Sequence, residues 1–363
     1  MANINDYLDW RGDVPLSAAT FNPADNLLLS QFAYMSLPIG APCALSAAAR
    51  SLISSGVAQG NNLLLAKHLA ASERFGAARI CRAEERLDEA LEMQFAALVM
   101  ELSDGTACVI FRGTDSTLVG WKEDLNMSFS EEVPSQAEAV RFLNGIRSYT
   151  ALPLRVMGHS KGGNLAVYSS ALCRREVQDD IIAVYNNDGP GLGDAAMASE
   201  GYARIEARVQ TFLPQSSVVG MLLNHPESYQ VIHADGSLGI VQHDPYAWET
   251  CRNGFICEGG LRRGSLYTDR TIKDWIKDIP NEQRKEFIDA LYTVLQATHA
   301  HTLSDLTAAW ARNSMAIIAG MGKLDPETRR HIHAVIGALL AACARNILRE
   351  PGAEDGADAP QGE

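Results

Sequence analysis

Hydrophobic and polar positions along the chain follow two periods, one typical of strands and one typical of helices. Strand-like runs are concentrated between residues 95 and 245, and helix-like stretches separate most of them. The strands that this pattern predicts are Phe95–Leu102, Thr106–Arg112, Leu152–Met157, Ile181–Asn186, Arg208–Leu213, Tyr229–Ala234 and Leu238–Gln242. Strands that alternate with helices indicate an α/β fold with a mostly parallel central sheet covered on both faces.

Two turn signals predict hairpins within this region. Ser103-Asp104-Gly105 separates the first two strands, and Asp235-Gly236 separates the last two. Asp-Gly pairs favour the tight turns that join antiparallel strands. We therefore expect an early and a late antiparallel pair in an otherwise parallel sheet.

Helical periodicity dominates both ends of the chain. A helix is expected near Asn22–Met35, capped by Asn22 or Asp25, and two short helices are expected within residues 44–77. Beyond residue 266 the strand signal disappears, and amphipathic helices are predicted at Asp274–Ile279, Asn281–Thr298, Leu303–Ile318 and Pro326–Leu348. The acidic, Gly- and Pro-rich end is typical of disorder. The pattern thus divides the chain into an α/β domain with its helical lead-in (1–265), a C-terminal helical appendage (266–349) and a disordered tail (350–363).

Composition narrows the class of protein. The 363 residues are 47% hydrophobic and 21% charged, which is typical of a soluble globular protein. The net charge of −13 argues against nucleic acid as a partner, because phosphate binding needs a basic surface. The start lacks the features of a signal peptide, and no stretch is apolar enough to span a bilayer. Together with seven scattered cysteines and no CxxC pair, this predicts a cytoplasmic protein without stable membrane insertion.

The strongest chemical signal is Gly158-His159-Ser160-Lys161-Gly162, which fits G-x-S-x-G. It lies between a predicted buried strand and a helix of small residues, the context in which this pattern forms a nucleophile elbow. On such a turn the serine hydroxyl stands above the carboxyl edge of the sheet, and the amide of Lys161 points toward a developing oxyanion. Ser160 is therefore the predicted nucleophile. A Gly-rich turn that only packs tightly is the alternative.

A second oxyanion donor is expected from the loop after an early strand. Ile110-Phe111-Arg112-Gly113-Thr114-Asp115 is the end of a strand that runs into a loop. The amide of Thr114, with its hydroxyl as a further candidate, can supply this donor. The competing interpretation is a polar turn capped by Thr114 and Asp115.

F-R-G-T (Phe111–Thr114), W-x-x-D-L (Trp121–Leu125) and G-H-S-x-G-G (Gly158–Gly163) resemble, in order and spacing, the signature motifs of class 3 lipases. With Asn187–Gly191 and Ser217–Met221, the chain resembles still more closely the Mbeg1-like family, a lipase-related group without an established substrate. This resemblance covers residues 94–245. It implies an α/β-hydrolase fold and hydrolysis of carboxylic esters, with Thr114 and Lys161 as oxyanion donors.

Two positions depart from the lipase pattern. Class 3 lipases usually carry leucine after the nucleophile, so Lys161 is expected to put a charge beside the site. Their catalytic acid lies in a D-I-V-P-like turn, but the corresponding stretch here, Ser216–Gly220, contains no carboxylate. Asp188 is the predicted acid instead, because it follows the strand next to the elbow strand at the same sheet edge. Ser217 is a remnant or polar support of the other acid position, and Asp188 could alternatively be only a turn residue.

The order Ser, acid, His along the chain predicts His243 as the base, at the end of a strand and the start of a turn. His225 and His233 are alternatives, and the second fits a structural role better. Asp244 could orient a base, although adjacent residues rarely form a productive His–Asp pair. His159, beside the nucleophile, is expected to be a packing residue.

The residues together predict a serine hydrolase of the lipase or esterase type, acting on a small-molecule or lipid ester through an acyl-enzyme. No cofactor or metal is expected. His331-Ile332-His333 points its rings apart on a helix, and no dinucleotide or phosphate-binding motif occurs. The alternatives are a hydrolase-fold protein without catalysis that serves in binding or assembly, and a peptidase or thioesterase with the same triad. The C-terminal helices could shape an acyl pocket or act as a lid.

Overall fold

The computed structural model describes residues 1–37, 42–115, 117–127, 130–223, 225, 227–236, 239–262 and 264, together with the isolated positions 282, 285, 286, 288, 289, 292 and 330. The four predicted C-terminal helices, apart from these isolated positions, and the predicted disordered tail lie outside the described residues.

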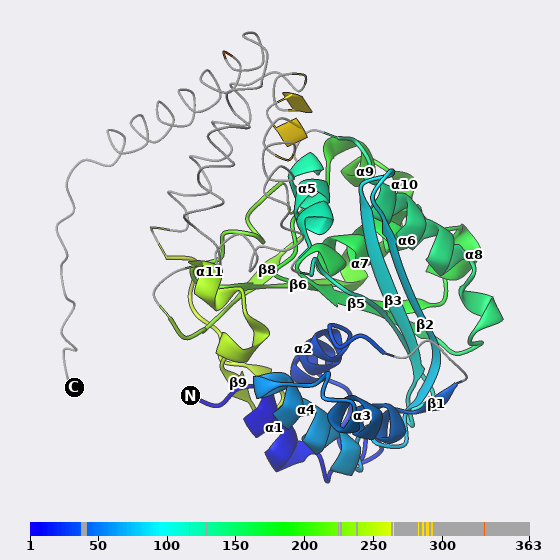
Figure 1. Ribbon diagram of the computed structural model, residues 1–363, viewed down its shortest axis with the longest axis vertical. Coiled ribbons are helices and arrows are strands. Elements are labelled where there is room, and N and C mark those ends of the chain that lie inside the picture. Colours follow the sequence, from blue (N-terminus) through cyan, green and yellow to red (C-terminus); the bar gives the residue numbers. More distant parts are fainter. Residues whose placement is uncertain are drawn as a thin grey trace, which may run out of the picture.

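An eight-stranded sheet organises the described part of the chain (Figure 1). Its strands follow one another in the order of the sequence. They are β1 (Cys43–Ala44), β2 (Arg79–Asp88), β3 (Met93–Glu101), β4 (Ala107–Phe111), β5 (Leu154–His159), β6 (Ile181–Asn187), β7 (Val209–Pro214) and β8 (Tyr229–Ile232). Strands β1 to β4 pair antiparallel, and β4 to β8 pair parallel. The parallel half therefore presents the carboxyl ends of five strands along one edge.

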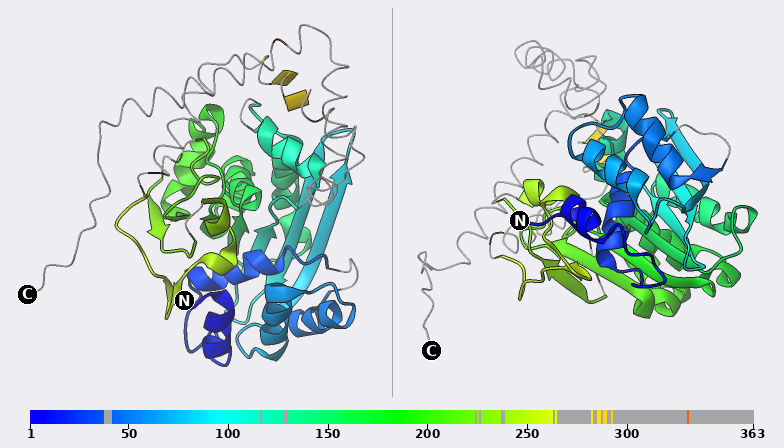
Figure 2. Two further views of the ribbon diagram at one scale, coloured as in Figure 1. Left: turned by 60° about the vertical axis from the view of Figure 1, so that its left-hand side comes forward. Right: turned by 90° about the horizontal axis from the view of Figure 1, so that it is seen from below.

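Helices connect the strands and cover the sheet. The α-helices are α1 (Ile4–Arg11), α2 (Pro23–Phe32), α3 (Leu45–Ser54), α4 (Gly60–Ala71), α5 (Leu118–Asn126), α6 (Pro134–Asn144), α7 (Lys161–Leu172), α8 (Arg175–Gln178), α9 (Asp194–Met197), α10 (Glu200–Ile205) and α11 (Gly239–Gln242). Three short 3-10 helices, η1 (Ile146–Ser148), η2 (Glu206–Arg208) and η3 (Pro245–Ala247), and a small pair of strands, β9 (Thr250–Cys251) and β10 (Gly254–Phe255), complete the elements. The N-terminal helices, blue in Figures 1 and 2, gather on one side of the sheet.

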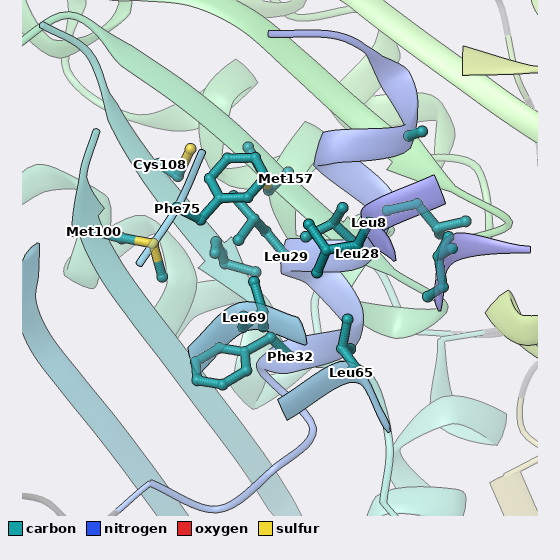
Figure 3. Packing of buried hydrophobic residues seen from close by; sticks show 14 of the residues in the cluster. Leu8, Leu28, Leu29, Phe32, Leu65, Leu69, Phe75, Met100, Cys108 and Met157 are labelled. Atoms are coloured by element: carbon teal, nitrogen blue, oxygen red, sulfur yellow. The ribbon is translucent and has the colours of Figure 1, made fainter. Parts of the chain in front are cut away.

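Alternate side chains of the central strands enter two separate cores. Met157 of β5 packs with α2 and α4, in the cluster drawn in Figure 3. Its neighbour Val156 packs with α6 and α7 on the opposite face. Because successive side chains of a strand point to opposite faces, a strand that is apolar throughout must be covered on both. The predicted two-sided coverage is confirmed.

The early hairpin is confirmed by the antiparallel pairing of β3 with β4. The structure also confirms the two helices predicted within residues 44–77. The predicted helix after Asn22 is present too, with Asn22 as its N-cap and Pro23 as its first residue. Strand β2 carries no clear sequence signal, because its outer half is polar and forms ion pairs such as Arg86 to Glu138 at 2.6 Å.

The prediction of a late hairpin is wrong. Residues 239–242 form helix α11 instead of a strand that pairs with β8. The side chain of Gln242 is buried and donates to the carbonyls of Ala234 and Gly236, at 3.1 and 2.6 Å. These bonds turn the chain back toward the sheet edge, so that residue 243 points over the carboxyl ends of the strands. The strand order, the two covered faces and the turn after β5 make this an α/β-hydrolase fold.

Candidate active site

Ser160 stands on a strained turn between β5 and α7. Its backbone lies at φ 58° and ψ −134°, a conformation that residues other than glycine rarely adopt. Its amide donates to the carbonyl of Asn187 at the end of β6, at 2.9 Å. A side-chain carbon on Gly158 would collide with the backbone of Gly162, and one on Gly162 would collide with the carbonyl of Phe111. The two glycines of the motif are therefore required by the close approach of helix α7 to the strands.

Three side chains form a continuous hydrogen-bonded chain at this sheet edge. Ser160 Oγ lies 2.9 Å from His243 Nε2, and His243 Nδ1 lies 2.6 Å from Asp188 Oδ2. Asp188 follows β6 and is fully buried, whereas the side chain of His243 is 18% exposed. The structure thus brings together the three residues predicted as nucleophile, base and acid.

Asp188 is held by two further donors. The hydroxyl of Ser217 donates to Asp188 Oδ1 at 2.5 Å, and the amide of Gly220 donates to the same oxygen at 3.2 Å. The stretch that lacks the lipase carboxylate therefore still faces the acid and supplies hydrogen bonds to it. Hydrogen bonds to an ionised carboxylate are stronger than neutral ones, so these donors favour a charged, fixed Asp188.

The loop that carries His243 is tied down from both sides. Trp248 Nε1 donates to the carbonyl of Gln242 at 2.9 Å, and the amide of Ser216 donates to Gln242 Oε1 at 2.8 Å. The carbonyl of His243 itself lies 2.8 Å from His159 Nε2. The expectation that His243 ends a strand is wrong, but its placement over the edge of the sheet is the predicted one.

His159 packs behind the base, as expected. Because its Nε2 faces a carbonyl oxygen, that nitrogen carries the proton, and its Nδ1 accepts from the hydroxyl of Tyr34 at 3.0 Å. Burial, with the charge of His243 as a smaller cause, holds the pKa of His159 well below its usual value. A neutral His159 therefore supports His243 without competing for the proton of Ser160.

The other candidate base and orienting residues have partners elsewhere. His225 lies 3.0 Å from Glu227 and 2.5 Å from the carbonyl of Gly220, and His233 lies 2.5 Å from Glu258. Asp244 accepts from the amide of Tyr246 and caps η3. In the described part of the chain, His243 is the one of these three histidines that lies within hydrogen-bonding distance of both Ser160 and Asp188.

The turn after β4 lies against the nucleophile. A side-chain carbon built on Gly113 would lie 3.0 Å from Cβ of Ser160, so the turn that continues into Thr114 packs against the nucleophile. The hydroxyl of Thr114 donates to Asp124, with distances of 2.7 and 2.6 Å to the two carboxylate oxygens. This bond leaves the backbone amide of Thr114 as the candidate oxyanion donor, and Asp115 instead accepts from the amide of Thr117.

Asp124 is an unusual carboxyl group. Burial raises its pKa to about 6, against opposing effects of Lys161 and of the Thr114 hydroxyl. The W-x-x-D-L motif contains this residue, but the sequence gives it no partner. Its contact with Thr114 joins residues on different elements and becomes visible only in the folded chain.

Lys161 does not put a free charge beside the site, contrary to expectation. Its side chain is buried, with 1% of its surface exposed. Nζ donates to Glu123 Oε2 at 2.8 Å and to the carbonyl and side-chain oxygens of Gln94, each at 2.9 Å. The charge is therefore neutralised inside the protein, and only the backbone amide of Lys161 remains a candidate for the oxyanion site.

Comparison with known proteins identifies the family. The family model described as Mbeg1-like matches residues 69–293, which is more than half of the chain. The chain belongs to the Mbeg1-like family. No curated protein matches the sequence.

Solved structures similar to this Mbeg1-like protein include fungal lipases. Lipase II from Rhizopus niveus is 13% identical over 57% of this chain and 78% of its own, with a TM-score of 0.38. The native Rhizomucor miehei lipase propeptide complex is 17% identical over 64% of this chain and 76% of its own, with a TM-score of 0.35. Triacylglycerol lipase from Penicillium expansum is 15% identical, covering 49% and 82%, with a TM-score of 0.30. Likenesses this distant carry no conclusion about the substrate.

Two further properties of this Mbeg1-like protein concern its described residues only. Among them, no three or more His, Cys, Asp or Glu side chains gather in a way that could hold a metal ion. The same residues include no helix with the length and apolar character needed to cross a bilayer.

Proposed function

We propose that this Mbeg1-like protein is a serine hydrolase of the lipase or esterase type that cleaves carboxylic esters through an acyl-enzyme at Ser160. The observation that carries the proposal is the chain of hydrogen bonds from Asp188 through His243 to Ser160, at 2.6 and 2.9 Å. A nucleophile within reach of a base that a buried carboxylate orients is the arrangement that activates a serine. The substrate class is a small-molecule or lipid ester.

Each residue has a defined task in this mechanism. His243 Nε2 takes the hydroxyl proton as Ser160 Oγ attacks the ester carbonyl, and Asp188 stabilises the resulting imidazolium. The backbone amides of Thr114 and Lys161 donate to the oxyanion of the tetrahedral intermediate. His243 then gives its proton to the leaving alcohol. In the second half, His243 deprotonates a water that attacks the acyl-enzyme, and the proton returns to Ser160 as the acid departs.

The geometry also bears on the alternative of a silent hydrolase-fold protein. The absence of a carboxylate at residues 216–220 slightly favours that alternative. Asp188 supplies a carboxylate to His243 from the neighbouring strand, and Ser217 supports it. A protein that uses this surface only for binding has no need of a buried acid on the far side of a histidine, so the hydrolase is favoured.

A labelling experiment tests the proposal. The full chain is treated with a fluorophosphonate probe, which reacts only with an activated serine, and hydrolysis of p-nitrophenyl butyrate is followed in parallel. We expect stoichiometric labelling at Ser160 and ester hydrolysis, and loss of both in Ser160→Ala. Ser216→Ala, which leaves the donors to Asp188 in place, is expected to keep the labelling at Ser160 and serves as the matched control.

Two outcomes would contradict the proposal. Full esterase activity in Ser160→Ala would remove Ser160 as the nucleophile. A folded wild-type protein that neither reacts with the probe nor hydrolyses esters would favour the silent binding protein.

A further inference from the structure

Two opposite charges are buried directly behind the nucleophile turn. Lys161 Nζ and Glu123 Oε2 are 2.8 Å apart, and their side chains are 1% and 0% exposed. Taking such a pair out of water is expensive unless the geometry is good and the remaining hydrogen-bonding capacity is used. The ammonium donates its other hydrogen bonds to the backbone carbonyl and the side-chain Oε1 of Gln94, each at 2.9 Å.

The carboxylate of Glu123 is equally well satisfied. Its Oε2 also accepts from the amide of Gln94 in β3 at 3.1 Å, and its Oε1 accepts from the amide of Ser135 at the start of α6 at 2.8 Å. Glu123 itself belongs to α5. One carboxylate therefore joins β3, α5 and α6 to the first residue of α7, which is Lys161.

The next residue of α5 extends this network to the other oxyanion donor. Asp124 Oδ1 lies 3.9 Å from Lys161 Nζ, and the same carboxylate accepts from the hydroxyl of Thr114. Glu123 thus binds the side chain of Lys161, which follows the nucleophile in sequence, and Asp124 binds the side chain of Thr114. The ammonium attracts both carboxylates, and the pKa of Asp124 is held lower by this charge than burial alone would set it.

We propose that Lys161 is a positioning residue, whose ammonium, paired with Glu123 and facing Asp124, fixes its own backbone amide and that of Thr114 relative to Ser160. The inference rests on the proposed function, because it concerns the oxyanion site of that reaction. Oxyanion donors act only from a narrow range of distances, and a displacement of about 1 Å can cost on the order of 100-fold in rate. An apolar residue at position 161 cannot pair with Glu123, so residue 161 would lose its anchor in α5. Asp124, which holds Thr114, would at the same time lose the positive charge that it faces.

The test removes both members of the buried Lys161–Glu123 pair together, so that neither is left without the other. Lys161→Met/Glu123→Gln is prepared in the full chain, and kcat and KM for p-nitrophenyl butyrate are measured after circular dichroism has established folding. Because donors to the oxyanion stabilise the transition state and not the bound ester, kcat is expected to fall about 10- to 100-fold with KM changed by less than about threefold. Glu123→Asp, which keeps the charge but shortens the arm by one methylene, serves as a milder variant with a fall in kcat of the same kind.

A matched control lies on the strand that carries the nucleophile. Arg155 at the start of β5 pairs with Asp104 at 3.1 Å, with side chains 14% and 18% exposed, at the opposite end of the strand from Ser160. Arg155→Met/Asp104→Asn also replaces the cation by methionine and the carboxylate by its amide, and is expected to keep kcat while losing thermal stability. A purely structural role of Lys161 predicts the same result for both pairs.

The outcomes separate the inference from the proposed function. If the wild type hydrolyses the ester through Ser160, and folded Lys161→Met/Glu123→Gln and Glu123→Asp both keep the wild-type kcat, the inference is overturned and the proposed function stands. If the folded wild type shows no Ser160-dependent turnover, the proposed function fails and the inference fails with it. A selective loss of kcat in these variants, absent from the control pair, supports the inference.

Discussion

The substitution Asp188→Asn gives the sharpest test of the proposed triad, because the structure determines how the new side chain must lie. Asp188 Oδ1 accepts two hydrogen bonds, from the hydroxyl of Ser217 and the amide of Gly220, and Oδ2 accepts from His243 Nδ1. An amide at this position keeps its oxygen where two donors point. Its NH₂ group therefore faces His243 Nδ1 and donates where the carboxylate accepts.

The consequence is the wrong tautomer of the base. His243 Nδ1 becomes an acceptor, so the ring proton moves to Nε2, which lies 2.9 Å from Ser160 Oγ. Nε2 can then no longer take the hydroxyl proton, and the imidazolium loses its counter-charge. We expect kcat to fall about 10³- to 10⁴-fold, equivalent to about 4 to 5.5 kcal/mol of transition-state stabilisation. Since the side chains have equal size and the two bonds to Oδ1 remain, we expect stability to fall by only about 1 to 2 kcal/mol.

The assay is steady-state hydrolysis of p-nitrophenyl butyrate at pH 8, with urea unfolding as the measure of stability. Asp244→Asn is the matched control: it neutralises a carboxylate next to His243 that caps η3 through the amide of Tyr246. This control is expected to keep kcat within about threefold. If Asp188→Asn kept wild-type kcat while Asp244→Asn lost it, Asp244 would orient the base and the assignment of Asp188 would be refuted.

Two further predictions concern stability. Asp124 has a pKa raised from 3.8 to about 6, so its ionisation costs the folded state stability that the unfolded chain does not lose. The free energy of unfolding of Asp124→Asn, relative to that of the wild type, should therefore rise by at most about 3 kcal/mol as pH rises from 4 to 6. Above pH 7 this difference should stay constant. Urea unfolding at several pH values measures this difference, and a difference independent of pH would contradict it. In the N-terminal lead-in, Arg74 pairs with Asp25 at 2.5 Å with both side chains fully buried. Arg74→Met should lower stability by about 3 to 5 kcal/mol, because it leaves the buried carboxylate of Asp25 without its counter-charge. Adding Asp25→Asn should restore part of this loss in thermal unfolding. An equally unstable double variant would argue that packing, not charge, is lost.

The sequence by itself determines the parts of this protein that depend on neighbouring residues. Buried strands such as β5 are recognised because they are apolar on both faces, and a cap such as Asn22 is recognised because it bonds its own helix. The nucleophile belongs to the same class: Gly158, Ser160 and Gly162 are close in sequence because the turn that needs them is local. The family resemblance reinforces these positions for the same reason, since it rests on short contiguous motifs.

Only the tertiary structure decides the parts that join distant segments. The acid could be chosen from the sequence because the strand order fixes which carboxylate lies beside the elbow, but Ser217 as its partner required the bond across 29 positions. The strand predicted at Leu238–Gln242 failed because the side chain of Gln242 satisfies two backbone carbonyls, a contact that the hydrophobic pattern does not record. His243 lies over the sheet edge as predicted, although a helix precedes it in place of the predicted strand.

The fate of Lys161 illustrates the difference most clearly. Its charge next to the nucleophile suggested a perturbed site, because sequence neighbours are near in space but say nothing of where a long side chain turns. The fold supplies Glu123 from a helix 38 positions away and buries both charges together. Short-range backbone geometry is written in consecutive residues, whereas the pairing of buried charges depends on which elements the sheet brings to one edge.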